Sequence, residues 1–338
     1  MDKRNGPARP LIGAQISTAG GFVPVPERAR AIGAEAVQVF VSNPRMWHRR
    51  VPSAEELSEF QAGLRAQGLP LFFHTIYLIN LATPDEELRN RSVEALAHSL
   101  TLGGVAGAAG VVTHLGSHRG EGYERGTAHA VEAIGRAWRM AAESRGAADD
   151  EPTSLPPLLL ETSTGGGASM GGRLEGLAEL VAALDSRSAS EADVPAGMAD
   201  VPADAARRSA GAAPRFGVCL DTAHLFAAGY PIHEADGLEN VVEELRGLGL
   251  LSRLGLVHLN DSSAPFASHW DRHDNPGEGQ IGYEGLTRVV RHPALAQVPF
   301  VLETPGADGH GPDGPNVAVV KSMRAGKPRP KAWPPPRA

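Results

Sequence analysis

Short apolar runs recur along the chain, each bounded by turn-forming or polar residues. Such a run predicts a strand that is buried on both faces, as in a parallel sheet. The candidate strands are Leu11–Ser17, Ala36–Phe40, Leu69–Thr75, Gly110–Leu115, Pro157–Thr162, Phe216–Asp221, Leu254–Asn260 and Pro299–Thr304. Amphipathic helical stretches lie between them, among them Ala54–Gln67, Glu86–Leu102 and Thr127–Ser144. Alternating strands and helices imply βαβ units, so the pattern predicts the α/β class and a single-domain (β/α)8 TIM barrel.

Six of the apolar runs end in a residue that can bind a metal ion. These residues are His74, His114, Glu161, Asp221, His258 and Glu303. The carboxyl ends of barrel strands converge on one face, which carries the active site in barrels of this kind. One histidine at a strand end is usually no more than a hydrogen-bonding residue. Six such ends on one rim favour a metal centre.

Three further candidates follow the strand ends. His224 stands three residues after Asp221, at the start of the next predicted helix, and Asp271 and His273 lie in the loop after the seventh strand. Nine ligands are too many for one catalytic zinc ion, which takes three protein ligands and a water. They would serve two or three ions, and a mixed set of histidines and carboxylates suits zinc, manganese or iron.

Charge and cysteine usage narrow the partners and the compartment. The formal charge of −7 argues against a nonspecific nucleic-acid-binding protein. Three divalent ions would bring that charge to about −1 and make the rim locally cationic, which suits a phosphate substrate. Cys219 is the single cysteine, so an internal disulfide is excluded and a buried, inert thiol is expected. No membrane helix or signal peptide is recognisable, and a cytoplasmic protein is expected.

Four segments depart from the barrel pattern. Residues 1–10 are predicted to be disordered, and the barrel domain is predicted to span residues 11–325. Ser144–Pro157 is a polar connector, and residues 186–214, rich in Ala, Ser, Asp and Pro, are predicted to be a flexible insertion. Both follow a helix and precede a strand, so they belong on the face remote from the ligands. The basic, Pro-rich tail 326–338 is predicted to be disordered.

Together these residues resemble the endonuclease IV family of metal-dependent apurinic/apyrimidinic (AP) endonucleases. The resemblance covers nearly the whole chain from Ile12 to about Thr304, apart from the two internal segments. The matching motifs are Ile12–Gly21, His74–Leu81, His114–His118, Leu160–Gly167, Gly217–His224, His258–Asp261 and Asp271–Gly279. Each motif alone is weak, but the set is highly specific.

The resemblance implies three zinc ions per chain, with manganese or iron able to occupy some of the sites. By this resemblance His74, His114 and Glu161 hold the first ion. Glu161 also bridges to a second ion, which is held with Asp221, His258 and Glu303. The third ion is held by His224, Asp271 and His273.

Members of the family cleave DNA on the 5′ side of an abasic nucleotide, leaving a 3′-hydroxyl and a 5′-deoxyribose phosphate, and they remove blocking groups from 3′ ends. The resemblance therefore implies a monomeric base-excision-repair enzyme that acts on double-stranded DNA. Paired ions supply a hydroxide of low pKa and clamp an in-line displacement at phosphorus. Our hypothesis is that hydroxide between the two ions linked by Glu161 attacks phosphorus, which makes Glu161 the catalytic carboxylate. The third ion would stabilise the leaving 3′ oxygen.

Four residues are predicted to contact DNA. The resemblance places the loop of Asn43, Arg45 and Trp47 in the minor groove, where Arg45 would hold open the gap beside a flipped-out abasic nucleotide. Tyr77, three residues after His74, would pack against the abasic sugar or its neighbours.

Five positions depart from the usual family pattern. Gln15 replaces a His, Thr75 an Asp, Leu115 a Pro, Thr162 an Asn and His269 an Arg. These positions surround the ligands or face DNA, so they bear on affinity, metal preference and substrate range more than on the reaction class.

Two other interpretations remain open. A sugar isomerase or epimerase of the same barrel superfamily would use one or two ions, but it would need neither the Asp271/His273 pair nor the Arg45 loop. A non-catalytic protein that binds damaged DNA would not require nine ligands. The metal content separates the nuclease from the isomerase, because about three ions per chain favour the nuclease and one or two favour the isomerase.

Overall fold

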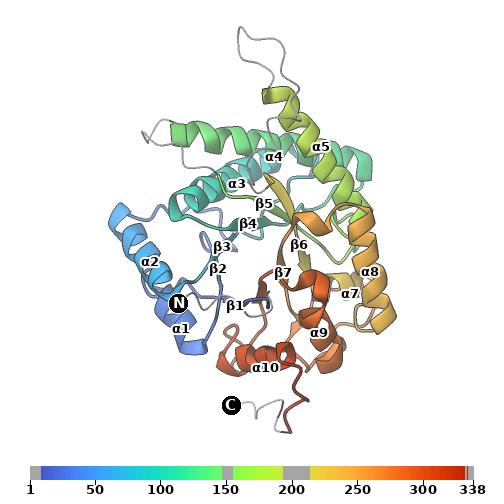
Figure 1. Ribbon diagram of the computed structural model, residues 1–338. Helices are drawn as coiled ribbons and strands as arrows, with labels where there is room; N and C mark the ends of the chain where they lie inside the picture. The colour runs from blue at the N-terminus through green and yellow to red at the C-terminus, as the bar shows by residue number, and fades with distance from the viewer. Residues whose placement is uncertain (1–8, 147–154, 193–213, 332, 334–338) are drawn as a thin grey trace.

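The computed structural model describes residues 9–146, 155–192, 214–331 and 333. Parallel strands form a closed barrel in the order β1, β10, β7, β6, β5, β4, β3, β2, so the last barrel strand pairs with the first. Helices surround the ring of strands (Figure 1). The predicted (β/α)8 barrel is confirmed, and every predicted strand contains one barrel strand.

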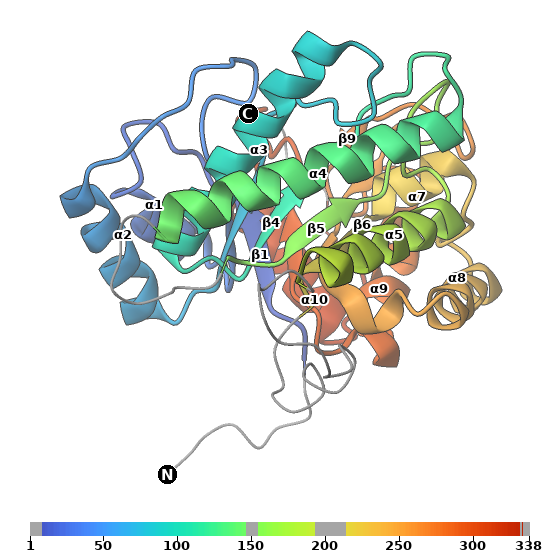
Figure 2. The ribbon, with the colours of Figure 1, turned by 90° about the horizontal axis from the view of Figure 1, so that it is seen from above.

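The barrel strands are β1 Ile12–Gln15, β2 Val37–Phe40, β3 Leu71–His74, β4 Gly110–Thr113, β5 Leu158–Glu161, β6 Phe216–Asp221, β7 Leu254–His258 and β10 Phe300–Leu302. The helices are α1 Val25–Ile32, α2 Ala54–Gln67, α3 Glu86–Ala106, α4 Tyr123–Gly146, α5 Leu174–Ala192, α7 Thr222–Ala228, α8 Ala235–Gly247, α9 Gly282–Arg291 and α10 Gly314–Arg324. Short 3-10 turns are formed by η1 Leu251–Arg253 and η2 Pro293–Leu295, and β8 Asp261–Ser262 pairs with β9 His273–Asp274 in an antiparallel ribbon. Seen from the side, α4 and α5 lie along the outside of β4 and β5 (Figure 2).

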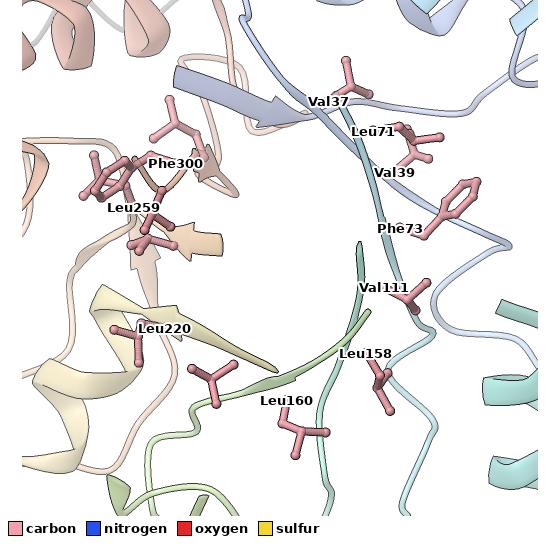
Figure 3. Close-up of a cluster of buried hydrophobic side chains, with 14 of the residues drawn as sticks. Val37, Val39, Leu71, Phe73, Val111, Leu158, Leu160, Leu220, Leu259 and Phe300 are labelled. Atoms are coloured by element: carbon pink, nitrogen blue, oxygen red, sulfur yellow. The ribbon is translucent and has the colours of Figure 1, made fainter. Parts of the chain in front are cut away.

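Alternate residues of each strand face the outside and the inside of the barrel. Outward side chains such as Val37, Phe73 and Leu160 belong to the main core (Figure 3). A second cluster takes one buried residue from each of six strands: Phe72, Val112, Leu159, Cys219, Leu256 and Val301. This cluster closes the middle of the barrel and includes the cysteine that was predicted to be buried.

Each residue of this inner cluster is followed two positions later by one of the six predicted strand-end ligands. Because the side-chain period of a strand is two, the ligands face the same interior as the apolar cluster, one layer nearer the carboxyl ends. The apolar layer thus forms the floor under the ligands, and barrel closure brings them together.

The segments predicted to be irregular are described only in part. Helix α5 continues to Ala192, so residues 186–192 of the predicted insertion are helical, and residues 193–213 lie outside the described residues. Helix α4 likewise continues to Gly146, inside the predicted connector, whose residues 147–154 are outside the described residues. Of residues 1–10, only 9 and 10 are described.

The described part of the C-terminal tail packs on the barrel, in contrast to the predicted disorder. The Tyr283 hydroxyl donates a hydrogen bond to the carbonyl of Lys327, and the Trp333 indole donates to the carbonyl of Pro276, at 2.9 and 2.8 Å. The indole and phenol rings can bury apolar surface while their polar tips are satisfied. Among the described helices, none is both long enough and apolar enough to cross a membrane.

Candidate metal centre

All nine predicted ligands lie near one another beyond the carboxyl ends of the strands, and six of them line an open pocket of about 350 Å³: His114, Glu161, His224, Asp271, His273 and Glu303. The ligand atoms of eight of the nine, all but Asp271, form three compact groups, within which all atoms lie within 4.8 Å of one another. The groups are His74, His114 and Glu161; Glu161, Asp221, His258 and Glu303; and Asp221, His224 and His273. The first two groups are the sets that the family resemblance implied.

The third group differs from the expected set, because it contains Asp221 where Asp271 was expected. Asp271 nevertheless lies beside it. Its two carboxylate oxygens are 3.2 Å from Nε2 of His273 and 3.3 Å from Nε2 of His224. Nε2 of His273 is also 3.5 Å from Oδ2 of Asp221, so two carboxylates face this pair of histidines.

The two carboxylate oxygens of Glu161 face different groups. Oε2 lies 3.1 Å from Nε2 of His74 and 3.4 Å from Nδ1 of His114. Oε1 lies 3.0 Å from Nδ1 of His258. Glu161 is buried and thereby held in place. A carboxylate that shares its oxygens between two neighbouring ligand groups has the geometry of a bridging ligand.

Backbone carbonyls orient three of the histidines. Nδ1 of His74 donates to the carbonyl of Thr75 at 2.7 Å, Nδ1 of His224 to that of Thr162 at 2.8 Å, and Nδ1 of His273 to that of Glu303 at 3.2 Å. Because a carbonyl only accepts, the proton of each neutral ring sits on Nδ1 and the Nε2 lone pair faces the carboxylates. Metal-binding histidines are commonly oriented in this way.

The position of His224 follows from the end of strand β6. Asp221 is the last residue of this strand and the N-cap of α7, and its Oδ1 accepts a hydrogen bond from the backbone N–H of His224 at 2.9 Å. Short polar side chains favour this cap because they satisfy a free amide of the first turn. A strand that passes directly into a helix therefore places two candidate ligands three residues apart.

The electrostatics of the pocket favour bound cations. Burial opposes charge on His273, but the carboxylates of Asp221 and Asp271 raise its pKa to about 9. Burial also opposes ionisation of Glu161, yet His114 and His258 hold the pKa of its carboxyl well below the ordinary range. The carboxylate of Glu161 thus stays ionised even though it is buried, and it attracts protons or metal ions.

The residues fit divalent metal ions. Nε2 of His273 is buried and makes no hydrogen bond within the described structure, despite its distance of 3.2 Å from Asp271. An orphaned buried nitrogen is costly, and a bound ion would supply its partner. Nitrogen and oxygen donors in groups of three or four match the ligand sets of zinc, manganese and iron.

The predicted DNA contacts stand on the same rim. Asn43 and Arg45 are exposed in a turn after β2, where Oδ1 of Asn43 accepts from the N–H of Arg45 at 3.0 Å. Tyr77 is 53% exposed and lines the pocket, and its N–H donates to the carbonyl of Pro44, so the two loops adjoin. Trp47 is half-buried under a stacked arginine, which points to loop packing.

Two further cations were not singled out from the sequence. Arg119 follows β4 and Arg272 lies between two ligands; both are exposed, and neither forms an ion pair in the part of the chain that the structure describes. The position of Arg272 between Asp271 and His273 was the available signal.

The five departures from the family pattern all contact the centre or its loops. Oγ1 of Thr75 donates to Thr113 at 2.9 Å, Oγ1 of Thr162 accepts from the N–H of Asp221 at 2.9 Å, and His269 donates to the carbonyl of Thr164 at 2.7 Å. Leu115 is buried, and its carbonyl accepts from the N–H groups of Leu81 and Ala82. Gln15 accepts a hydrogen bond from the side chain of Gln38.

Comparisons with known proteins agree with this arrangement. Residues 26–190 and 202–327 match the family described as xylose isomerase-like TIM barrel. A probable endonuclease 4 of Halothermothrix orenii is 34% identical over 93% of this chain and 99% of its own length. The probable endonuclease 4 of Streptomyces avermitilis is 36% identical over 96% of this chain and 94% of its own.

Among solved structures, the chain is again similar to an endonuclease IV. Endonuclease IV from Thermus thermophilus superposes with a TM-score of 0.69 at 33% identity, covering 94% of this chain and 98% of its own. A 3-keto-D-glucoside 4-epimerase from E. coli superposes with a TM-score of 0.59, but at 14% identity. The second likeness reflects the shared fold alone.

Proposed function

The chain belongs to the endonuclease IV family, and we propose that it is a zinc-dependent nuclease that cleaves DNA on the 5′ side of abasic nucleotides. The products are a 3′-hydroxyl and a 5′-deoxyribose phosphate, and the same centre removes blocking groups from 3′ ends. The observation that carries this proposal is the buried carboxylate of Glu161, which faces His74 and His114 with one oxygen and His258 with the other.

Three zinc ions fit the three ligand groups, with manganese or iron as alternatives at some of them. When bound, such ions supply a strong nucleophile from water at neutral pH and neutralise the charge of a phosphodiester. Glu161 links two groups and keeps their spacing fixed. The exposed carboxylate of Asp271 completes the third group at the open side of the pocket, where a substrate enters.

The residues of the rim explain how an acidic protein binds DNA. Arg272 lines the pocket, and Arg45 and Arg119 are exposed in the loops after β2 and β4; none of the three has an acidic partner among the described residues, so they are free to contact phosphates. Tyr77 offers an exposed ring beside the pocket for the sugar of the flipped nucleotide. Asn43 holds the turn that presents Arg45, and Trp47 packs the base of that loop.

A sugar isomerase or epimerase remains the second candidate, because its barrel is the same. Such an enzyme needs one or two ions, whereas Asp271, His273 and His224 form an additional ligand set at the rim. This set and the unpaired arginines favour a large polyanionic substrate. The proposed enzyme acts as a cytoplasmic monomer on double-stranded DNA.

The test is cleavage of a labelled duplex that carries one abasic-site analogue, before and after chelation of the protein. Incision directly 5′ of the analogue, lost on chelation and restored by zinc or manganese, is the expected result, together with about three ions per chain. A duplex ending in a 3′-phosphoglycolate tests end cleaning separately. Absence of incision by fully metallated protein would sink the proposal, and sugar phosphates would then be screened.

A further inference from the structure

A buried amide lies directly behind the metal ligands. Gln38 of β2 is fully buried, and its Nε2 donates to Oε1 of Gln15 at 2.9 Å and to Oε1 of Glu303 at 2.6 Å. Its Oε1 accepts from Nε2 of His258 at 2.9 Å. One side chain thus uses both of its N–H donors and its carbonyl on partners from three other segments of the barrel.

These partners permit only one orientation of the Gln38 amide. Glu303 offers a carboxylate and Gln15 its carbonyl, and both groups accept hydrogen bonds. A flipped amide would turn its oxygen toward two acceptors and leave both unpaired, and an unpaired buried acceptor is destabilising. The carbonyl of Gln38 must therefore face His258.

The orientation of the amide decides which nitrogen of His258 can bind a metal. Because Oε1 of Gln38 only accepts, Nε2 of His258 must carry a proton. Nδ1 is then the ligand atom, and it lies 3.0 Å from Oε1 of Glu161 and 3.2 Å from Oε2 of Glu303. The same amide holds the other oxygen of Glu303, so it fixes two ligands of one group.

Gln15 lies where it can steady this amide. In the barrel, Gln15 pairs in register with Gln38. The chain at Gly13 can approach the segment before β2 closely because Gly13 has no Cβ, and a Cβ there would lie only 2.5 Å from the carbonyl oxygen of Ala36. Gln15 is only partly buried and lines a neighbouring hollow of about 480 Å³. The side-chain carbonyl of Gln15 is the acceptor for one of the two N–H donors of the buried Gln38 amide.

We propose that Gln38 and Gln15 are positioning residues of the metal centre: together they set Nδ1 of His258 and one oxygen of Glu303 for the ion shared with Glu161 and Asp221. This inference rests on the proposed function in that the centre holds metal ions. It also gives Gln15, one of the departures from the family pattern, a defined task. Hydrogen-bonded partners of metal ligands typically change metal affinity about 10- to 100-fold when they are removed.

The test compares metal binding by the intact chain and by three variants. Gln38→Leu removes the amide, Gln15→Leu removes its acceptor, and Gln15→Glu keeps an acceptor at the same position. Zinc affinities are measured by titrating the metal-free proteins against a chromophoric chelator. The geometry around the ions is monitored by the visible spectrum after substitution with cobalt.

For Gln38→Leu we expect one ion to bind about 10- to 100-fold more weakly, the remaining ions to be unaffected, and the cobalt spectrum to change. Gln15→Leu should give a smaller effect of the same kind, and Gln15→Glu should restore the wild-type values. A purely structural role would lower the melting temperature of the metal-free protein without a selective loss of one ion.

Equal affinities for every ion in wild type and Gln38→Leu, with identical cobalt spectra, would overturn the inference. If Gln38→Leu does not fold, the variants Gln15→Leu and Gln15→Glu decide the question, because Gln15 is only partly buried. Zinc affinities and cobalt spectra equal to those of wild type in Gln15→Leu would then overturn the inference. No readout uses DNA. A wild-type protein that binds zinc but does not cut abasic DNA therefore contradicts the proposed function and leaves this inference standing.

Discussion

At the scale of single residues, the candidate centre depends on which atoms face one another. Glu161 divides its two oxygens between two ligand groups, and backbone carbonyls fix the ring nitrogens of His74 and His224. Replacement of one carboxylate oxygen of Glu161 by NH₂ can therefore disrupt the link between its two ligand groups without changing the size of the side chain.

The first prediction concerns Glu161→Gln. The carboxamide has the same shape, but it presents one NH₂ group where the carboxylate had an accepting oxygen, so it cannot serve both ligand groups. Incision of abasic DNA should fall by at least about 10²-fold, in line with the loss of a key electrostatic group in an active site. Steady-state kinetics and metal analysis on the same preparation measure the effect. Near-wild-type turnover with full metal content would exclude a bridging role for Glu161.

At the scale of elements, the loop between β8 and β9 presents an exposed aromatic ring at the rim. Trp270 is 68% exposed, although the loop around it is firmly anchored. The N–H groups of Ala267 and His269 donate to the carbonyls of Phe226 and Ala227 at 3.1 and 2.9 Å. A large ring held in water beside Asp271 has no packing role within the described structure, and it is suited to stacking on a base or sugar.

The second prediction is that Trp270→Ala weakens duplex binding by about 1–3 kcal/mol, the usual range for one aromatic–base contact, while Trp270→Phe retains most of the affinity. Fluorescence anisotropy of a labelled abasic duplex provides the measurement. The matched control is Met140→Ala, a partly exposed apolar residue on α4. If both alanine variants bind like wild type, Trp270 has no part in DNA recognition.

The contact between α10 and β1 is a second element-level feature. Glu35, just before β2, accepts hydrogen bonds from the N–H of Ile12 at 2.9 Å and from the guanidinium of Arg324, and it lies 3.2 Å from Nζ of Lys321. Burial opposes its ionisation, but Arg324 and the other donors lower its pKa from 4.5 to about 2. This carboxylate ties the last helix to the first strand.

The third prediction is that Glu35→Gln lowers the free energy of unfolding at pH 7 by about 1–2 kcal/mol, a value reduced for solvent screening. Because the pKa of Glu35 is depressed in the folded state, its contribution is complete above pH 4.5 and is lost as the pH falls toward 2. Urea unfolding across this range measures it. Glu27→Gln, in an exposed pair with Arg30, is the control and should have no effect. If the difference in the free energy of unfolding between wild type and Glu35→Gln does not shrink as the pH falls toward 2, the depressed pKa of Glu35 is contradicted.

At the scale of the whole molecule, the two ends of the barrel have separate tasks. The ligands and the rim arginines follow the carboxyl ends of the strands, whereas the segment between α5 and β6 leads into the amino end of a strand. Barrels of this kind tolerate changes at the amino-terminal face without loss of chemistry.

The fourth prediction is that deletion of residues 195–211 leaves metal content and the rate of incision unchanged within about twofold, since they connect α5 to the amino end of β6, away from the carboxyl ends that carry the candidate ligands. Metal analysis and the abasic-duplex assay on the shortened protein are sufficient. A large loss of activity with an intact melting temperature would assign this segment a role in catalysis or DNA binding.

The sequence by itself determined the strands, the barrel and the candidate ligands at the strand ends. It could do so because a buried strand has a side-chain period of two, so a ligand two residues after an inner apolar residue must face the same interior, as His74 follows Phe72. The step from Asp221 to His224 was equally local, since it depends only on a strand that passes into a capped helix.

Only the tertiary structure decided how the ligands are grouped and oriented. The position of Asp221 in two groups, the antiparallel ribbon that carries His273, and the link from Gln15 through Gln38 to His258 all join segments distant in the chain. The helical start of the predicted insertion and the contacts of the described tail residues Lys327 and Trp333 were also missed, because composition reports neither helix length nor long-range contacts. Distances across a barrel depend on closure and register, and no local pattern of residues encodes them.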